Sequence, residues 1–200
     1  MKQFEGKVIF VTGSSGTIGS ELIKQLTNNL SYKPKEVIGI DNNESALFFQ
    51  DQQYINNPKV NFFVTDIRDR SEVTRRMKGV DIVIHTAALK HVVLCERSPD
   101  QAVSTNINGL QNIIEAAIEL DVKKVIALST DKASSPINLY GATKLCADKL
   151  FLSANSLVGK KQTSFSVVRY GNVFGSRGSV IPFFIDLINK KQKLIITDPD

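Results

Sequence analysis

A tyrosine and a lysine lie four residues apart, at Tyr140 and Lys144, in a segment whose sequence predicts a helix. Side chains at this spacing share one face of a helix, so both can act on the same substrate. The lysine ammonium favours the phenolate, which lowers the pKa of the tyrosine and lets it take a proton from a sugar or alcohol hydroxyl. Thr130, at the end of the preceding predicted strand, can share that hydrogen bond. The three residues predict a site where a hydroxyl loses its proton as hydride leaves the same carbon.

An acid and a base follow this threonine directly, as Asp131 and Lys132. Oxidation of an alcohol by itself needs neither group. A protonated carboxyl can donate to a departing hydroxyl, and a neutral amine in a closed site can remove a proton from carbon. The pair therefore favours elimination of water, as in a dehydratase, over simple dehydrogenation. The alternative is an ordinary exposed ion pair in a loop.

A glycine-rich loop follows the first predicted strand and opens the first predicted helix, with glycines at every third position. The first glycine permits a tight turn, the second lets a pyrophosphate approach the backbone, and the third lets the helix pack close to the strand. Unpaired N–H groups at the positive end of the helix then bind the phosphates. We expect dinucleotide contacts from Gly13, Ser15, Gly16, Thr17, Ile18 and Gly19.

An acidic residue, Asp41, ends the second predicted strand, where a carboxylate can accept both ribose hydroxyls of an adenosine. Its charge repels a 2′-phosphate, so an NAD(P) site here favours NAD. Asp41 could instead cap the helix that begins near Glu44, and Asp66 could equally be a helix cap. The remaining cofactor contacts that we expect come from the ends of strands three and four and from the catalytic helix: Asp66, Ile67, Ala87, Ala88, Tyr140 and Lys144.

Short apolar runs alternate with helical patterns along the whole chain. Strands are predicted at 7–12, 36–40, 60–65, 81–86, 124–129 and 164–169, and helices at about 18–30, 44–54, 72–77, 99–120 and 139–156. Near-continuous apolar strands indicate burial on both faces, and the alternation requires right-handed crossovers between parallel strands. The sequence predicts an α/β fold with a doubly wound parallel sheet, Rossmann-like. An amphipathic segment at 181–189 and a possible strand at 193–197 follow.

Length and composition fit one globular domain, with 200 residues, 42% of them hydrophobic and 22% charged. We expect residues 1–200 to form an NAD(P)-binding domain, with a nucleotide-sugar-binding region starting at about 171–200. The chain stops at Asp200 without a helix cap or polar tail. We therefore expect a fragment from which the C-terminal substrate portion is largely missing.

Charge and cysteine content exclude several classes of function. The net charge of +5 is modest and scattered, which argues against a nucleic-acid partner and suits an anionic nucleotide substrate. Cys95 and Cys146 have neither metal-ligand spacing nor a disulfide framework, so we expect no metal. No signal peptide and no apolar run of about 20 residues is present. The expected location is the cytoplasm, without a membrane partner.

With these residues in place, the chain resembles the extended short-chain dehydrogenase/reductase superfamily. Segment 128–144 looks closely like that of the inverting UDP-N-acetylglucosamine 4,6-dehydratases, the first enzymes of pseudaminic acid biosynthesis. Segments 87–91, 105–109 and 169–182 extend the match, and the resemblance covers essentially the whole chain. Residues 129–132 and 140–144 are its specific parts, whereas the glycine loop is shared by the entire superfamily.

The resemblance implies a reaction cycle on UDP-N-acetylglucosamine. Tyr140 removes the proton of the sugar 4-hydroxyl, oriented by Thr130, as hydride passes to NAD(P)⁺. Lys132 then takes the C5 proton, Asp131 protonates the departing 6-hydroxyl, hydride returns to C6, and reprotonation from the other face inverts C5. Retaining relatives carry methionine in place of Tyr140, and glucose-type dehydratases carry Asp-Glu after the threonine, so the inverting branch is favoured.

Substrate contacts are expected from Lys90, Thr130, Asn172, Arg177 and Ser179, with the last three meeting the diphosphate of the sugar nucleotide. Two other functions stay open, a UDP-sugar 4-epimerase and a non-catalytic dinucleotide-sensing protein. His85, inside an apolar strand, is expected to be a core residue, and Asn106 to brace backbone near the catalytic helix. The resemblance also implies a homo-oligomer.

Overall fold

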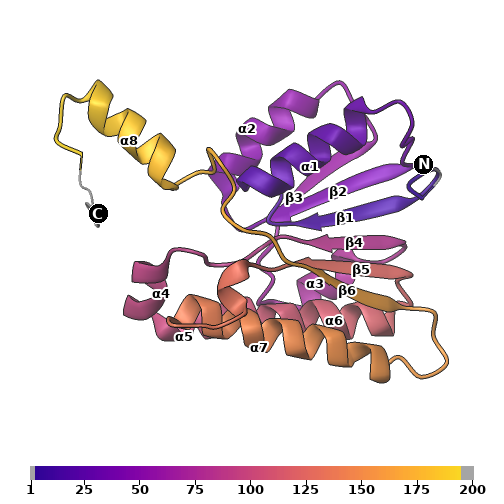
Figure 1. The fold of residues 1–200 in the computed structure, drawn as a ribbon. Coiled ribbons are helices and arrows are strands. Elements are labelled where there is room, and N and C mark those ends of the chain that lie inside the picture. The colour runs from indigo at the N-terminus through magenta and orange to yellow at the C-terminus, as the bar shows by residue number, and fades with distance from the viewer. Residues whose placement is uncertain (1–2, 195–200) are drawn as a thin grey trace.

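Among the described residues, the sheet has six parallel strands in the order β3-β2-β1-β4-β5-β6 (Figure 1). The structure is a computed structural model that describes residues 3–194. The doubly wound α/β prediction is confirmed, and each predicted strand is present to within two residues at either end. The strands are β1 (Val8–Thr12), β2 (Glu36–Asp41), β3 (Val60–Val64), β4 (Ile82–His85), β5 (Lys124–Leu128) and β6 (Ser164–Val168).

Helices cover both faces of the sheet, which explains why the central strands are apolar along most of their length. In β1 every residue is buried. Phe10 packs into the core shared with the helices after β3, β4 and β5, whereas Ile9 and Val11 pack with Ile23 and Leu26 of the first helix. Successive side chains of a strand point to opposite faces, so one strand supplies both cores.

The helices mostly follow the sequence prediction. They are α1 (Thr17–Asn28), α2 (Glu44–Tyr54), α3 (Arg70–Arg76), α4 (Val92–Arg97), α5 (Pro99–Val103), η1 (Ser104–Gly109), α6 (Leu110–Glu119), η2 (Asp131–Ala133), α7 (Leu139–Ser153), η3 (Ala154–Ser156) and α8 (Val180–Asn189). Two features differ from prediction. The helix predicted at 99–120 contains a π-helical stretch, η1, and the short helix α4 precedes it.

The strand order changes direction between the neighbouring strands β1 and β4. From β1 the chain continues to β2 and β3 on one side of the sheet, and from β4 it continues to β5 and β6 on the other side. At such a point the loops after the carboxyl ends of the strands separate and leave a crevice that binds ligands. The glycine loop follows β1, and the segments that carry Lys90, Asp131 and Asn172 follow β4, β5 and β6. All these loops therefore belong to one edge of the sheet.

The last helix, α8, extends away from the sheet (Figure 1). Its apolar side chains Val180, Phe183, Ile185 and Ile188 are exposed. The strand suggested at 193–197 falls largely outside the described residues. Between residues 3 and 194, no helix combines the length and apolarity that crossing a membrane requires.

Candidate active site

The glycine loop is shaped by two close approaches that leave no room for a side chain. Gly13 has a φ of +65°, and a Cβ there would lie 2.7 Å from the Ala87 nitrogen, at the end of β4. A Cβ on Gly19 would lie 2.3 Å from the Gly13 carbonyl oxygen. The loop thus packs directly on its own helix and on the neighbouring strand end. The geometry fits a dinucleotide pyrophosphate at the N-terminus of α1.

A cavity of about 470 Å³ opens beside this loop. It brings together most of the residues singled out from the sequence: Gly13, Gly16, Thr17, Ile18, Gly19, Ala88, Lys90, Thr130, Lys132, Tyr140, Lys144, Asn172, Arg177 and Ser179. Sequence reasoning did not assign Tyr170 or His91, which also line it. Six predicted site residues do not line the cavity: Ser15, Asp41, Asp66, Ile67, Ala87 and Asp131.

Tyr140 and Lys144 both face this cavity from α7, one helical turn apart. Lys144 is buried, and its Nζ donates to the Leu128 carbonyl oxygen at 2.7 Å. Burial lowers the pKa of Lys144 to about 8, against the opposing effect of the Asp148 carboxylate.

Burial has the opposite effect on the tyrosine, since it raises the pKa of Tyr140, and hydrogen bonding with Thr130 acts against the rise. This rise contradicts the prediction that the Tyr140 pKa is lowered. The lysine ammonium is directed to the end of β5 instead.

Two caps and one glycine fix the position of α7. The Asn138 side chain accepts the Gly141 N–H at 2.9 Å, and Glu96 of α4 accepts the Leu139 N–H at 2.7 Å. A Cβ on Gly141 would lie 2.5 Å from the Lys132 carbonyl oxygen. The helix that carries Tyr140 and the turn that carries Lys132 are therefore in contact at a point where only glycine fits.

Lys132, which lines the cavity, forms an ion pair with Asp131, which does not; Lys132 Nζ lies 3.3 Å from Asp131 Oδ1. The Thr130 hydroxyl donates to the same carboxylate oxygen at 2.9 Å, and Lys132 Nζ also donates to Asn172 Oδ1 at 3.1 Å. The hydrogen bonds from Thr130 and then Lys132 hold the pKa of Asp131 below its ordinary range. The carboxylate is therefore charged in this arrangement, and the protonated Asp131 of the implied elimination step stays a prediction.

The end of β6 supports this turn from behind. The Ser129 N–H donates to the Val168 carbonyl at 2.8 Å, and the Asp131 N–H donates to the Tyr170 carbonyl at 3.0 Å. Arg169, which lies between Val168 and Tyr170 in the sequence, pairs with the buried Asp148 of α7 at 2.8 Å. The strand end therefore connects the acid–base turn to the helix that carries Tyr140. Sequence reasoning missed Asp148. The signal that could have found it is an acidic residue one helical turn after Lys144.

Asp41 connects the glycine loop to the start of α2. Its Oδ2 accepts the Ser15 N–H at 3.1 Å and the Ser15 hydroxyl at 2.7 Å, and its Oδ1 accepts the Asn43 N–H at 3.0 Å. The cap of α2 is Asn43, whose side chain accepts the Ala46 N–H. The alternative in which Asp41 caps this helix is therefore wrong.

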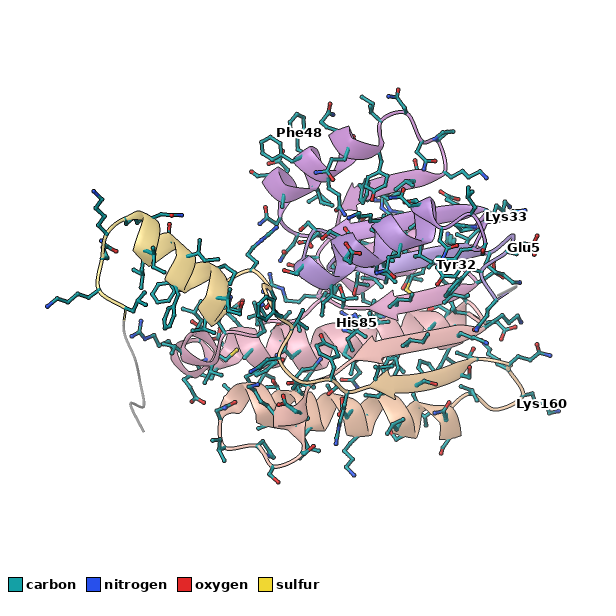
Figure 2. All side chains as sticks on the ribbon, turned by 45° about the horizontal axis from the view of Figure 1, so that its top comes forward. Glu5, Tyr32, Lys33, Phe48, His85 and Lys160 are labelled. Carbon is teal, nitrogen blue, oxygen red and sulfur yellow. The ribbon has the colours of Figure 1, made fainter. Side chains whose placement is uncertain are left out.

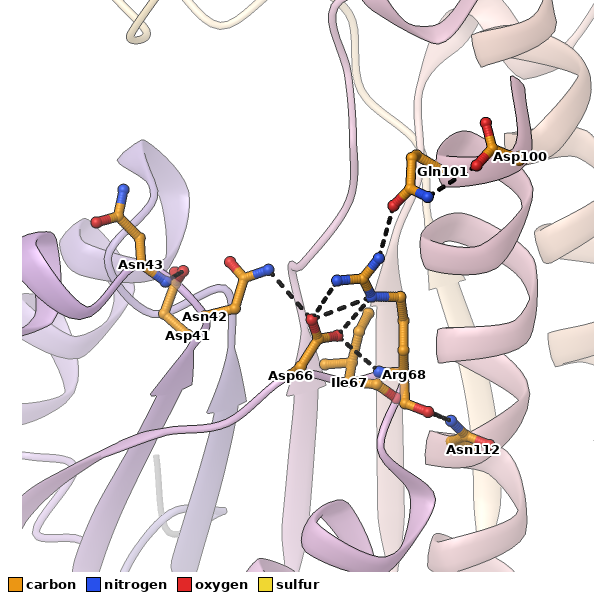
Figure 3. Close-up of polar contacts among 9 residues, drawn as sticks. All are labelled: Asp41, Asn42, Asn43, Asp66, Ile67, Arg68, Asp100, Gln101 and Asn112. Atoms are coloured by element: carbon orange, nitrogen blue, oxygen red, sulfur yellow. Dashed lines mark hydrogen bonds and ion pairs between the residues drawn. The ribbon is translucent and has the colours of Figure 1, made fainter. Parts of the chain in front are cut away.

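Asp66 lies in an ion pair with Arg68 (Figure 3). The contact between Arg68 Nη2 and Asp66 Oδ2 measures 2.6 Å, and this hydrogen bonding lowers the pKa of Asp66. The cap of α3 is Asp69, so the capping alternative for Asp66 is also wrong. Ile67 is buried against Gly109, where a Cβ would lie 2.7 Å from Ile67 Cδ1.

Lys90 and Arg177 meet over the glycine loop. Lys90 Nζ donates to the Arg177 carbonyl oxygen at 2.8 Å, and the Arg177 N–H donates to Thr17 Oγ1 at 3.0 Å. Burial, and then the charge of Arg177, lower the pKa of Lys90. The buried Ser179 hydroxyl has no hydrogen-bond partner among the described residues. The expected contact of these residues with the substrate stays a prediction.

Asn106 and His85 have structural roles next to the site, as predicted. Asn106 accepts the Leu89 N–H, donates to the Leu89 carbonyl and donates to the Thr143 hydroxyl of α7 at 3.1 Å. His85 is buried inside the protein (Figure 2), 2.8 Å from Thr12 Oγ1 through its Nδ1. Burial lowers the pKa of His85 to about 3, so its ring is neutral.

The fold and the cavity together define a Rossmann-like α/β protein with a Tyr-Lys pair and an Asp-Lys pair at the carboxyl edge of its sheet. A sequence family described as "Polysaccharide biosynthesis protein" matches residues 9–200. The chain belongs to this family.

Individual relatives are consistent with this assignment. The chain is 50% identical over 196 residues to "UDP-N-acetylglucosamine 4,6-dehydratase (inverting)" of Campylobacter jejuni, which confirms the resemblance drawn from the sequence. It is 47% identical to "Uncharacterized membrane protein MJ1061" of Methanocaldococcus jannaschii and 40% identical to "UDP-glucose 4-epimerase" of Rickettsia bellii. Each match covers 98% of this chain and 58% of the relative, so the chain spans little more than half the length of these proteins.

Solved structures match the fold closely. Pen from Bacillus thuringiensis superposes with a TM-score of 0.93 at 42% identity, over 98% of this chain and 59% of that one. DesIV, a dTDP-glucose 4,6-dehydratase from Streptomyces venezuelae solved with NAD and TYD bound, gives 0.81 at 26% identity, over 94% of this chain and 63% of that one.

Proposed function

We propose that the protein is a nucleotide-sugar 4,6-dehydratase that converts UDP-N-acetylglucosamine to a UDP-4-keto-6-deoxy sugar with inversion at C5. The observation that carries the proposal is the position of Lys132. It lines the same cavity as Tyr140 and Lys144, beside the glycine loop, and contacts Asp131 at 3.3 Å. An acid–base pair next to an oxidation site allows elimination after the ketone has formed.

Tyr140 begins the reaction as the base that takes the proton of the sugar 4-hydroxyl, with Thr130 as its hydrogen-bond partner. When bound, NAD(P)⁺ supplies the acceptor for the hydride from C4 and later returns that hydride to C6. The resulting 4-ketone acidifies the C5 proton. Lys132 takes this proton, the C5–H electron pair forms the C5=C6 bond as the C6–O bond breaks, and Asp131 protonates the leaving oxygen, which departs as water. After hydride has been added at C6, a proton that originates from solvent reaches C5 from the other face of the ring and inverts that centre.

Together, Asp131 and Lys132 carry the number of protons that elimination needs, but the proton lies on the lysine rather than on the carboxylate. Elimination needs a neutral lysine and a protonated aspartic acid, whereas the structure has an ion pair. Transfer of one proton across the contact from Lys132 Nζ to Asp131 Oδ1 converts one form into the other. Exclusion of water by a bound sugar nucleotide disfavours both charges and so promotes this transfer.

NAD rather than NADP is the proposed cofactor. The support is Asp41, whose carboxylate lies directly beside Ser15 of the glycine loop. A 2′-phosphate placed there would meet this negative charge, whereas ribose hydroxyls can donate to it. The NAD bound to DesIV supports an NAD(P) site in general.

A UDP-sugar 4-epimerase is the second candidate, and the Rickettsia relative supports it. An epimerase would use Tyr140, Lys144 and the cofactor in the same way and leave the 6-hydroxyl in place. It gives no role to Lys132 in the cavity, which is why the dehydratase is favoured. A cytoplasmic location, a homo-oligomer and the absence of a nucleic-acid partner stay predictions.

The deciding experiment incubates the protein in its natural full length with UDP-N-acetylglucosamine in D₂O and follows the sugar by proton NMR. The proposal predicts a new C6 methyl signal, deuterium at C5 and inverted coupling at C5. An intact C6 hydroxymethyl with an altered C4 would establish the epimerase instead. An unchanged sugar in the presence of bound dinucleotide would contradict both.

A further inference from the structure

Asn172 is a second partner of the Lys132 amine, in addition to Asp131. Its Oδ1 accepts a hydrogen bond from Lys132 Nζ at 3.1 Å, across 40 residues of sequence. A lysine ammonium can only donate, so the amide oxygen must face the lysine and the NH₂ group points elsewhere. The amine is thereby held between two oxygens, one charged and one neutral.

The backbone on both sides of this contact is fixed independently of it. Asp131, next to Lys132, donates its N–H to the Tyr170 carbonyl at 3.0 Å, and Arg169 pairs with the buried Asp148 of α7 at 2.8 Å. Asn172 lies two residues beyond Tyr170. Its amide is therefore presented to Lys132 by a segment attached to both the acid–base turn and the catalytic helix.

We infer that Asn172 is a positioning residue for proton removal at C5: its amide oxygen holds Lys132 Nζ over the sugar ring, away from full pairing with Asp131. The inference rests on the proposed dehydratase function. It differs from the expectation that Asn172 binds the substrate diphosphate, because it assigns the asparagine to one chemical step. A neutral acceptor orients the amine and leaves it available as a base, which a second carboxylate would not.

Removal of the amide should separate the two halves of the reaction. In Asn172→Ala we expect C4 oxidation, followed in single turnover by absorbance of the reduced nicotinamide, to stay within about threefold of the wild type. Elimination, followed by the C6 methyl signal and deuterium at C5, should fall by about 100-fold, the effect of roughly 1 Å of misplacement on a reacting group.

Replacement by a carboxylate gives a readout that a merely structural role would not produce. In Asn172→Asp the amine lies between two carboxylates, which favour the ammonium. The rising limb of the pH profile for deuterium incorporation at C5 should move up by about one pH unit, while that of C4 oxidation stays unchanged. The other titratable groups around the cavity are the same in both proteins: Asp131, Tyr140, Lys144, Tyr170, Lys90, His91 and Arg177.

Asn56→Asp is the matched control, since it makes the same change of charge at an exposed position before β3, on the opposite edge of the sheet. The inference is overturned if Asn172→Ala slows oxidation and elimination equally, the result expected of a diphosphate contact. It is also overturned if Asn172→Asp leaves the C5 profile in place. Failure of the wild type to form the C6 methyl would instead refute the proposed function, so the two failures can be told apart.

Discussion

Replacement of Lys144 by methionine should stabilise the cofactor-free protein at neutral pH. The side chain is buried, and its pKa drops from 10.5 to about 8 because burial disfavours the ammonium. This drop corresponds to about 3 kcal/mol of lost stability at pH 7. Methionine has a similar length and no charge, but it loses the hydrogen bond to the Leu128 carbonyl, worth about 1 kcal/mol. The expected net gain is about 2 kcal/mol.

The pH dependence of this gain follows from the direction of the shift. Between pH 8 and pH 10.5 the unfolded chain binds more protons at Lys144 than the folded chain, so the wild type gains stability as the pH rises through this window. Below pH 8, the full loss of stability caused by the buried ammonium is present. At about pH 9.5 the penalty is about 1.5 kcal/mol, and the advantage of Lys144→Met should nearly vanish.

Urea unfolding of the wild type and the variant at both pH values, without cofactor, measures these differences. Lys149→Met is the matched control, because Lys149 lies on the same helix and is exposed. Its stability should change little at either pH. The reasoning would be refuted if Lys144→Met were less stable than the wild type at pH 7, or if its gain in stability were equal at both pH values. Either result would mean that burial of the Lys144 ammonium does not destabilise the fold.

Further variants test the separate parts of the site. Asp41→Ala should bring the dissociation constants of NAD⁺ and NADP⁺, measured by titration, closer together, and unchanged selectivity would contradict its role. Gly141→Ala should cost about 1–3 kcal/mol in urea unfolding, because its Cβ would meet the Lys132 carbonyl at 2.5 Å; a neutral effect would mean that the two segments separate easily. Tyr140→Phe should slow the first hydride transfer by about 100-fold or more in stopped-flow absorbance, and a normal rate would exclude it as the base. Lys132→Ala should still oxidise C4 slowly but form no C6 methyl by NMR, and full dehydration would show that another group removes the C5 proton.

The fold could be predicted from the sequence because its signals are local. Each strand is a short apolar run, and the first ends in a glycine loop whose spacing has one structural interpretation. Helix α4 was missed since only Cys95 of its six residues is buried, which leaves no periodic apolar pattern. The π-helical stretch η1 was also missed, because the sequence pattern of residues 99–120 is that of a continuous helix. It includes Asn106, which bonds to the Leu89 backbone and to Thr143.

The candidate site also has parts that local sequence predicts and parts that depend on tertiary packing. Tyr140 and Lys144 are related by helical spacing, so their common orientation could be predicted from the sequence. Glu96 and Leu139, or Lys132 and Asn172, are about 40 residues apart and meet only through the packing of different elements. Protonation states also depend on packing. A sequence gives the types of the acid and the base, but the further lowering of the Asp131 pKa depends on hydrogen bonds from Thr130 and Lys132 that the folded turn positions.

Thr130 connects the two proton transfers of the proposed reaction. A hydroxyl has one hydrogen to donate, and here Thr130 donates it to the ionised Asp131. Hydrogen bonding with Thr130 already acts against the rise in the Tyr140 pKa that burial causes. Once Asp131 has taken the proton of Lys132, its oxygen no longer requires that hydrogen, and Thr130 can turn it to the Tyr140 oxygen and stabilise the phenolate. The transfer that creates the acid and the base for elimination thus also activates the tyrosine for oxidation, so a site closed over its substrate becomes competent for both steps together.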